Sequence, residues 1–263
     1  MPNYSSIDRP ATLSYVFYPR KDVTPCPGHA FDLPISVEDN VSILCRFYLQ
    51  HSGRPWILFF HGNGEVVSDY DEMAPLYHQH NLNLIVTDYR GYGASEGVPT
   101  LRDLAHDAHV LFQETKGELS KRGYRDDLWV MGRSLGSISA LELACHHQDA
   151  LPGLIIESGF VSVVRIIRHL GIPVDGEDLD RIDQECVEMA KQIKIPSLII
   201  HGEDDILVPF REAQELYQHL GAEQKQLLSI PNAGHNDLLF VGFQAYFQAL
   251  EQFIQTTDSR KSG

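Results

Sequence analysis

The stretch from Leu128 to Ser137 constrains the fold of this chain more than any other. It opens with four apolar residues, typical of a buried strand, and the pentapeptide Gly132–Gly136 (GRSLG) follows at once. Apolar residues at helical spacing then predict a helix. A serine between strand and helix in the pattern G-x-S-x-G lies on a sharp turn that holds its hydroxyl clear of the backbone. The flanking glycines have no Cβ to collide where strand and helix come close. Ser134 is therefore a candidate nucleophile.

A second copy of the same pattern, GASEG at residues 93–97, shows that the pentapeptide alone is not specific. The nearest apolar run before it ends near Asp88, and Val98-Pro99 follows it. Because a residue before proline disfavours the helical conformation, no helix is expected to begin there. We interpret Ser95 as a loop serine and Ser134 as the nucleophile.

Charge and composition limit the classes of partner. The chain has 263 residues, 21 of them basic and 36 acidic, which gives a formal net charge of −15. This charge argues against nucleic acid or an anionic membrane surface as a partner. No apolar run approaches the roughly 18 residues needed to span a bilayer, and no basic start precedes an apolar segment. The four cysteines form no C-x-x-C pair. These features predict a cytoplasmic protein with free thiols and no membrane insertion.

Apolar runs alternate with amphipathic segments along the chain, which predicts an α/β fold with a mostly parallel sheet and helices on both faces. An early hairpin makes one end of the sheet antiparallel. The predicted strands are at 31–37, 41–49, 56–60, 82–87, 128–131, 153–157, 197–200 and 226–230. Besides the helix that follows Ser134, the predicted helices cover 68–80, 100–121, 161–170, 184–192, 210–220 and 237–254.

These elements predict one domain at 29–256. An irregular lead-in precedes it at 1–28, with an edge strand at 13–18, and a frayed tail follows it at 257–263. Residues 161–195 are interpreted as a short, cap-like connection between two strands.

A serine hydroxyl needs a base, and that base needs an orienting carboxylate. His235 follows the last predicted strand and is the candidate base. The candidate acids are Asp205, which the pattern H-G-x-x-D-x-x-V-P favours, and the alternatives Glu203, Asp204 and Glu157. His201, at the end of a strand, is interpreted as a structural hydrogen-bonding residue.

An acyl-transfer site also needs hydrogen-bond donors for the oxyanion. The backbone N–H of Leu135, directly after the nucleophile, is one candidate. The loop His61–Gly64 follows a buried strand, and we choose the N–H of Asn63 as the second. No G-K-[ST] follows that loop, so it is not expected to bind a phosphate. No cofactor and no metal ion is expected.

Five segments together resemble the signature blocks of the α/β-hydrolase superfamily, and most closely its single-domain ABHD-type serine hydrolases. The segments are FHGNG at 60–64, DYRGYGASEG at 88–97, MGRSLGS at 131–137, HGEDD at 201–205 and GHND at 234–237. The resemblance covers about residues 30–255. It implies an α/β-hydrolase fold, a triad of Ser134, Asp205 and His235, and oxyanion donors at Asn63 and Leu135. The short connection at 161–195 predicts a minimal cap on this fold.

The function expected from this resemblance is that of a serine hydrolase. Its substrate would be a carboxylic ester, a thioester or a small amide of small to medium size, cleaved through an acyl-enzyme on Ser134. The alternatives are a non-catalytic ligand-binding protein, a peptidase or a cofactor-free haloperoxidase. The connection offers an apolar stripe of Val161, Val164, Ile167 and Leu170. So small a surface predicts acyl chains of roughly two to six carbons.

Overall fold

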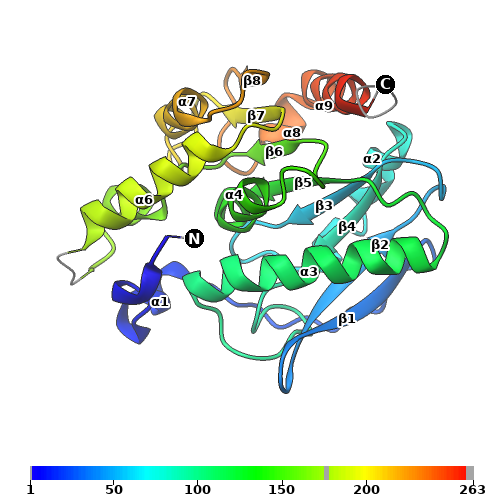
Figure 1. The fold of residues 1–263 in the computed structure, drawn as a ribbon, viewed down its shortest axis with the longest axis horizontal. Helices are drawn as coiled ribbons and strands as arrows, with labels where there is room; N and C mark the ends of the chain where they lie inside the picture. Colours follow the sequence, from blue (N-terminus) through cyan, green and yellow to red (C-terminus); the bar gives the residue numbers. More distant parts are fainter. Residues whose placement is uncertain (1, 175–177, 259–263) are drawn as a thin grey trace.

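The computed structural model describes residues 2–174 and 178–258, and a single eight-stranded sheet runs through it (Figure 1). The strands lie in the order β1-β2-β4-β3-β5-β6-β7-β8. Their bounds are β1 Ala30–Glu38, β2 Val41–Tyr48, β3 Trp56–Phe60, β4 Asn83–Thr87, β5 Leu128–Arg133, β6 Leu154–Glu157, β7 Ser197–Gly202 and β8 Lys225–Ile230. Strand β2 pairs antiparallel with β1 and β4, and every other pairing is parallel. The predicted fold class and the early hairpin are confirmed.

Helices cover both faces of the sheet, as Figure 1 shows. The α-helices are α1 Pro10–Val16, α2 Ala74–Gln79, α3 Leu101–Lys121, α4 Ser137–His146, α5 Val163–His169, α6 Leu179–Gln192, α7 Phe210–His219, α8 Leu238–Val241 and α9 Phe243–Asp258. Short 3₁₀ turns lie at η1 Tyr4–Ser6, η2 Val67–Tyr70 and η3 Ser134–Gly136. None of the helices in the described ranges has the length and apolar character required to cross a bilayer.

The central position of β3 in the sheet explains why every residue of this strand is apolar. Trp56, Leu58 and Phe60 pack into a hydrophobic cluster with α3, α4 and α6, whereas Ile57 and Phe59 pack into a second cluster with α2 and α9. Successive side chains of a strand point to opposite faces, so a strand covered on both sides must be apolar at every position.

Helix α3 begins where the sequence predicts, directly after Thr100. The Thr100 hydroxyl accepts a hydrogen bond from the backbone N–H of Asp103 at 3.0 Å. This N-cap satisfies one of the donors that a helix leaves unpaired in its first turn.

The N-terminal prediction was wrong. Residues 10–16 form helix α1, not part of an edge strand at 13–18, and the lead-in is therefore not irregular throughout. Pro10 occupies the first turn of α1, where the missing N–H costs nothing. The short, mostly apolar and aromatic run at 13–18 did not distinguish strand from helix here.

Two predicted helices are interrupted. The segment 68–80 divides into η2 and α2, and Pro75 lies in the first turn of α2. The segment 237–254 divides into α8 and α9 at Gly242, where a Cβ would lie 2.7 Å from the side chain of Ile230. The predicted tail begins inside α9 at residue 257, and residues 259–263 lie outside the described ranges.

Candidate active site

Ser134 lies at the junction of β5 and α4, within the short turn η3, with a φ of 51°. This left-handed conformation is costly for a residue with a side chain and marks a local strain that surrounding structure maintains. A Cβ on Gly132 would collide with the carbonyl oxygen of Gly136, and one on Gly136 with that of Phe60. The two glycines thus permit the close approach that the sequence pattern predicts.

Ser95, in the second copy of the pattern, lies in a loop. Its hydroxyl oxygen accepts a hydrogen bond of 2.9 Å from the backbone N–H of Leu44 on β2. The side chain therefore anchors the loop to the sheet, in line with its interpretation as a loop serine.

His235 and Asp205 come together across the loops that follow β8 and β7. The Nδ1 atom of His235 lies 2.7 Å from Oδ2 of Asp205. The other carboxylate oxygen accepts hydrogen bonds from the backbone N–H groups of Leu207 (2.9 Å) and Val208 (2.8 Å). A carboxylate only accepts, so Nδ1 of His235 is the donor in this contact, and in the neutral imidazole the lone pair is then on Nε2.

Asp205 differs from the neighbouring acidic residues in burial and charge. It is buried, whereas Glu203 and Asp204 are exposed. Burial raises the pKa of Asp205, but its contacts with His201 and His235 outweigh burial and bring the pKa well below its usual range. His201 donates from Nε2 to the carbonyl oxygen of Val208 at 2.8 Å, so its role is structural, as the sequence predicts. Asp205 stays ionised and can orient the imidazole of His235.

Asn63 follows β3 and lines the same cavity as Ser134 and Leu135. Its side-chain oxygen accepts hydrogen bonds from the hydroxyl of Tyr92 (2.6 Å) and the backbone N–H of Tyr18 (3.0 Å). Its side-chain nitrogen donates to the carbonyl oxygen of Val16 at 2.7 Å. The side chain is thus committed to holding the N-terminal segment, a role that the sequence did not reveal, and the backbone N–H is the group available as an oxyanion donor.

We expect Asn63→Ala to separate these two roles. The variant keeps the backbone N–H, so kcat should fall by much less than the about 10²–10³ that the loss of one oxyanion donor costs. The loss of three side-chain hydrogen bonds should instead lower the free energy of unfolding by about 1–3 kcal/mol and raise KM. Separate measurement of kcat and KM, with urea unfolding, checks this. A hundredfold loss of kcat in a folded variant would assign the role to the side-chain amide.

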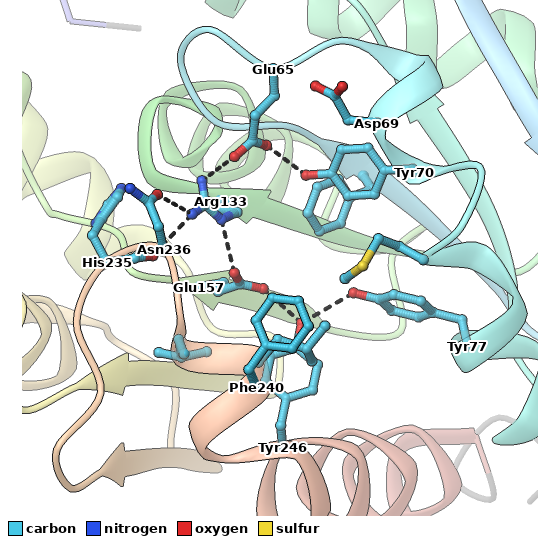
Figure 2. Close-up of a pocket in the computed structure, with 14 residues that line it drawn as sticks. Glu65, Asp69, Tyr70, Tyr77, Arg133, Glu157, His235, Asn236, Phe240 and Tyr246 are labelled. Atoms are coloured by element: carbon cyan, nitrogen blue, oxygen red, sulfur yellow. Dashed lines mark hydrogen bonds and ion pairs between the residues drawn. The ribbon is translucent and has the colours of Figure 1, made fainter.

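Arg133, the residue before the candidate nucleophile, joins the loops of the site, and the sequence analysis missed it. Figure 2 shows its guanidinium between Glu65, Glu157 and Asn236. It forms an ion pair with Glu65 and donates to Glu157 Oε1 (3.0 Å), to the carbonyl oxygen of His235 (2.9 Å) and to Asn236 Oδ1 (3.0 Å). The turn that carries Ser134 and the loop that carries His235 are therefore in direct contact.

The two carboxylates extend this network. Glu65 Oε2 accepts from the backbone N–H of Gly62 (2.8 Å), in the loop of the candidate oxyanion donor. Glu157 Oε2 accepts from the hydroxyl of Tyr246 (2.7 Å). Glu157 was one of the candidate acids, and its two oxygens instead bind Arg133 and Tyr246. Burial lowers the pKa of Arg133, and the two glutamates more than compensate, so the guanidinium stays charged.

Replacing Arg133 by methionine should leave two carboxylates without their partner. The Arg133 side chain is 12% exposed and that of Glu157 is 9% exposed. Breaking a buried ion pair from one side costs about 3–5 kcal/mol, and we expect that loss in the free energy of unfolding. The matched control is Arg181→Met, because Arg181 also pairs with two carboxylates but is 47% exposed. It should cost about 1 kcal/mol or less. Equal losses in urea unfolding would contradict a structural role for Arg133.

A cavity of about 700 Å³ opens beside Ser134. Helix α5 supplies one wall, but Val161 and Val164 of the predicted stripe are buried in the core instead. Helix α1 and the residues after it supply a second wall, so the apolar surface is larger than the sequence predicts. The apolar and aromatic residues lining the cavity are Tyr15, Val16, Tyr18, Leu135, Phe160, Val163, Ile166, Ile167, Leu170, Ile172, Pro173, Leu207 and Val208.

Comparison with solved structures supports the same fold. The esterase Pf2001 of Pyrococcus furiosus superposes with a TM-score of 0.73 at 17% identity, over 90% of this chain and 98% of the esterase. A soluble variant of the monoglyceride lipase of Saccharomyces cerevisiae superposes with a TM-score of 0.67 at 17% identity, over 89% of this chain and 99% of the lipase.

Sequence comparison identifies the family. The uncharacterized protein YfhR of Salmonella typhimurium is 30% identical over 272 residues, which covers 95% of this chain and 90% of YfhR. Protein bem46 of Schizosaccharomyces pombe is 28% identical over 243 residues, which covers 86% of this chain and 77% of bem46. The sequence model of the family described as serine aminopeptidase, S33, matches residues 51–172 and 176–239. The chain therefore belongs to the S33 family of the α/β-hydrolase superfamily.

Proposed function

We propose that this protein is a serine hydrolase that cleaves carboxylic esters, or related thioesters and small amides, of small to medium substrates. The observation that carries the proposal is the 2.7 Å contact between His235 and Asp205, on loops adjoining the strained turn of Ser134. A serine hydroxyl, a carboxylate and an imidazole in this order along the chain have the chemistry of an acyl-transfer triad.

The reaction would proceed in two halves. The Ser134 hydroxyl oxygen attacks the ester carbonyl carbon while His235 Nε2 takes its proton, and the backbone N–H groups of Asn63 and Leu135 stabilise the oxyanion. The intermediate then expels the alcohol, which receives the proton from His235. Water repeats the sequence on the acyl-enzyme, releases the carboxylic acid and restores the free serine.

The cavity beside Ser134 supports a longer acyl chain than the sequence suggests. A cavity of about 150 Å³ holds a benzene molecule, so one of about 700 Å³ has room for more than six carbons. Each buried methylene contributes about 0.8 kcal/mol, or roughly fourfold in kcat/KM. The cavity wall consists largely of uncharged side chains, which favours a neutral acyl group over the ammonium group of a peptide N-terminus.

We expect kcat/KM on p-nitrophenyl esters to rise with acyl length and to peak at about eight to ten carbons. Ile166→Phe should move the peak to shorter chains, because Ile166 lines the cavity. The control is Val98→Phe, at a side chain that is 75% exposed and outside the cavity. A peak at two to four carbons would contradict the role of the cavity. The absence of hydrolysis on the whole series, together with the absence of labelling by a fluorophosphonate, would contradict the proposed function and favour a ligand-binding protein.

A further inference from the structure

Three histidines and a glutamate form a cluster between α3 and α4, remote from the candidate active site. His109 belongs to α3, Glu142 and His146 lie four residues apart on α4, and His147 follows α4. Figure 1 shows the two helices side by side. The cluster's residues on α4 lie in the second half of that helix, about 12–18 Å from Ser134 along the helix axis.

The separations within the cluster suit a metal ion. Glu142 Oε1 lies 3.1 Å from His109 Nε2 and 3.1 Å from His146 Nδ1. The three ligand atoms all lie within 4.8 Å of one another. Ligand atoms bound tetrahedrally to zinc at about 2.0–2.1 Å are about 3.3 Å apart, so two of the three separations already approach that value.

The burial of Glu142 is compatible with a cation at the cluster. The Glu142 side chain is 2% exposed, and a buried carboxylate is stabilised by nearby positive charge. A metal ion bound between Glu142 and the two histidines would add such a charge.

Hydrogen bonds around the cluster fit metal binding. His109 Nδ1 lies 2.8 Å from His147 Nε2. When His109 donates this bond, its Nε2 lone pair is directed at the position between it and Glu142. A ligating histidine commonly donates its other ring N–H in this way. His146 Nδ1 also lies 2.9 Å from the carbonyl oxygen of Glu142, and it must release that contact to bind a metal.

We propose that His109, Glu142 and His146 bind one divalent transition-metal ion, best matched by Zn²⁺, and that His147 orients His109. Two imidazoles and a carboxylate form a donor set that zinc accepts, whereas Mg²⁺ and Ca²⁺ prefer oxygen ligands alone. The ion would join α3 to α4 and leave the candidate triad unchanged. The sequence gives no metal motif because the ligands come from two helices.

Titration of the tag-free, chelator-treated full-length protein with Zn²⁺ by calorimetry tests the site. We expect one ion per chain and a higher Tm with Zn²⁺ present. His109→Gln and His146→Gln should each weaken binding by at least about tenfold. Titration with Co²⁺ should give a visible absorption band that the same variants lose. The readouts do not depend on ester hydrolysis, so they are separate from the proposed function.

Two controls make the test specific. His106→Gln alters an exposed histidine of α3 that contacts Asp107 and should leave Zn²⁺ affinity unchanged. Cys145→Ser removes a neighbouring thiol, directed at Gln192, and should also have no effect. Absence of stoichiometric binding, unchanged affinity in the two histidine variants, or loss of binding in Cys145→Ser alone would each overturn the proposal. If His109→Gln does not fold, the Zn²⁺ affinity of His146→Gln tests the proposal. The His146 side chain is 42% exposed, so its replacement should not prevent folding.

Discussion

Replacing Ser134 by alanine is expected to reduce kcat for ester hydrolysis by about 10⁶-fold, the largest effect predicted for any single substitution in this chain. The substitution removes only the hydroxyl group, and without this group no acyl-enzyme can form. The residual rate would reflect binding and oxyanion stabilisation alone. Hydrolysis of a p-nitrophenyl ester of medium chain length measures the loss. Labelling with a fluorophosphonate, followed by peptide mapping, shows which serine reacts.

The chain supplies its own control for this experiment in Ser95→Ala. Ser95 lies in the same G-x-S-x-G pattern, but its hydroxyl is engaged with the backbone of Leu44. The variant should keep its labelling and kcat, and should lose about 1 kcal/mol of unfolding free energy with the missing hydrogen bond. Labelling that persists in Ser134→Ala, or that maps to Ser95, would contradict the assignment.

Much of the architecture could be predicted because its determinants are local. The continuous apolar run of β3 reflects burial on both faces, and Thr100 caps α3 through a contact three residues away. The glycines around Ser134 reflect close backbone approach at one turn. In each case the local structure requires a particular residue type, so the requirement can be recognised in the sequence.

The features that could not be predicted from the sequence depend on contacts between segments that are distant along the chain. Arg133 occupies a variable position of the G-x-S-x-G motif, so the motif predicts no role for it. Its partners Glu65 and Glu157 can be identified only once the three strands that precede or carry these residues lie side by side. The contribution of α1 to the cavity requires Asn63 to hold the backbone near Val16. His109 and Glu142 likewise meet only through the packing of α3 against α4. Such contacts leave no periodic pattern in the chain.

The second large effect is expected from replacing the carboxylate that orients His235. The sequence left four candidates for this carboxylate. Asp205→Asn should lower kcat by about 10⁴-fold while Asp204→Asn stays near the unmodified rate. In the structure, the backbone N–H groups of Leu207 and Val208 face one oxygen of Asp205. They would hold the oxygen of the new amide, so its NH₂ group would face His235.

That orientation explains the size of the expected loss. An amide NH₂ donates to Nδ1 of His235, which places the imidazole proton on Nε2 and removes the lone pair that must accept the serine proton. Asp204 is exposed and keeps its backbone hydrogen bond to the carbonyl oxygen of Ala233 in either form, so it controls for the change of charge. Unfolding in urea should show that both variants are folded under assay conditions. Equal losses of kcat in the two variants, or a larger loss in Asp204→Asn, would transfer the orienting role away from Asp205.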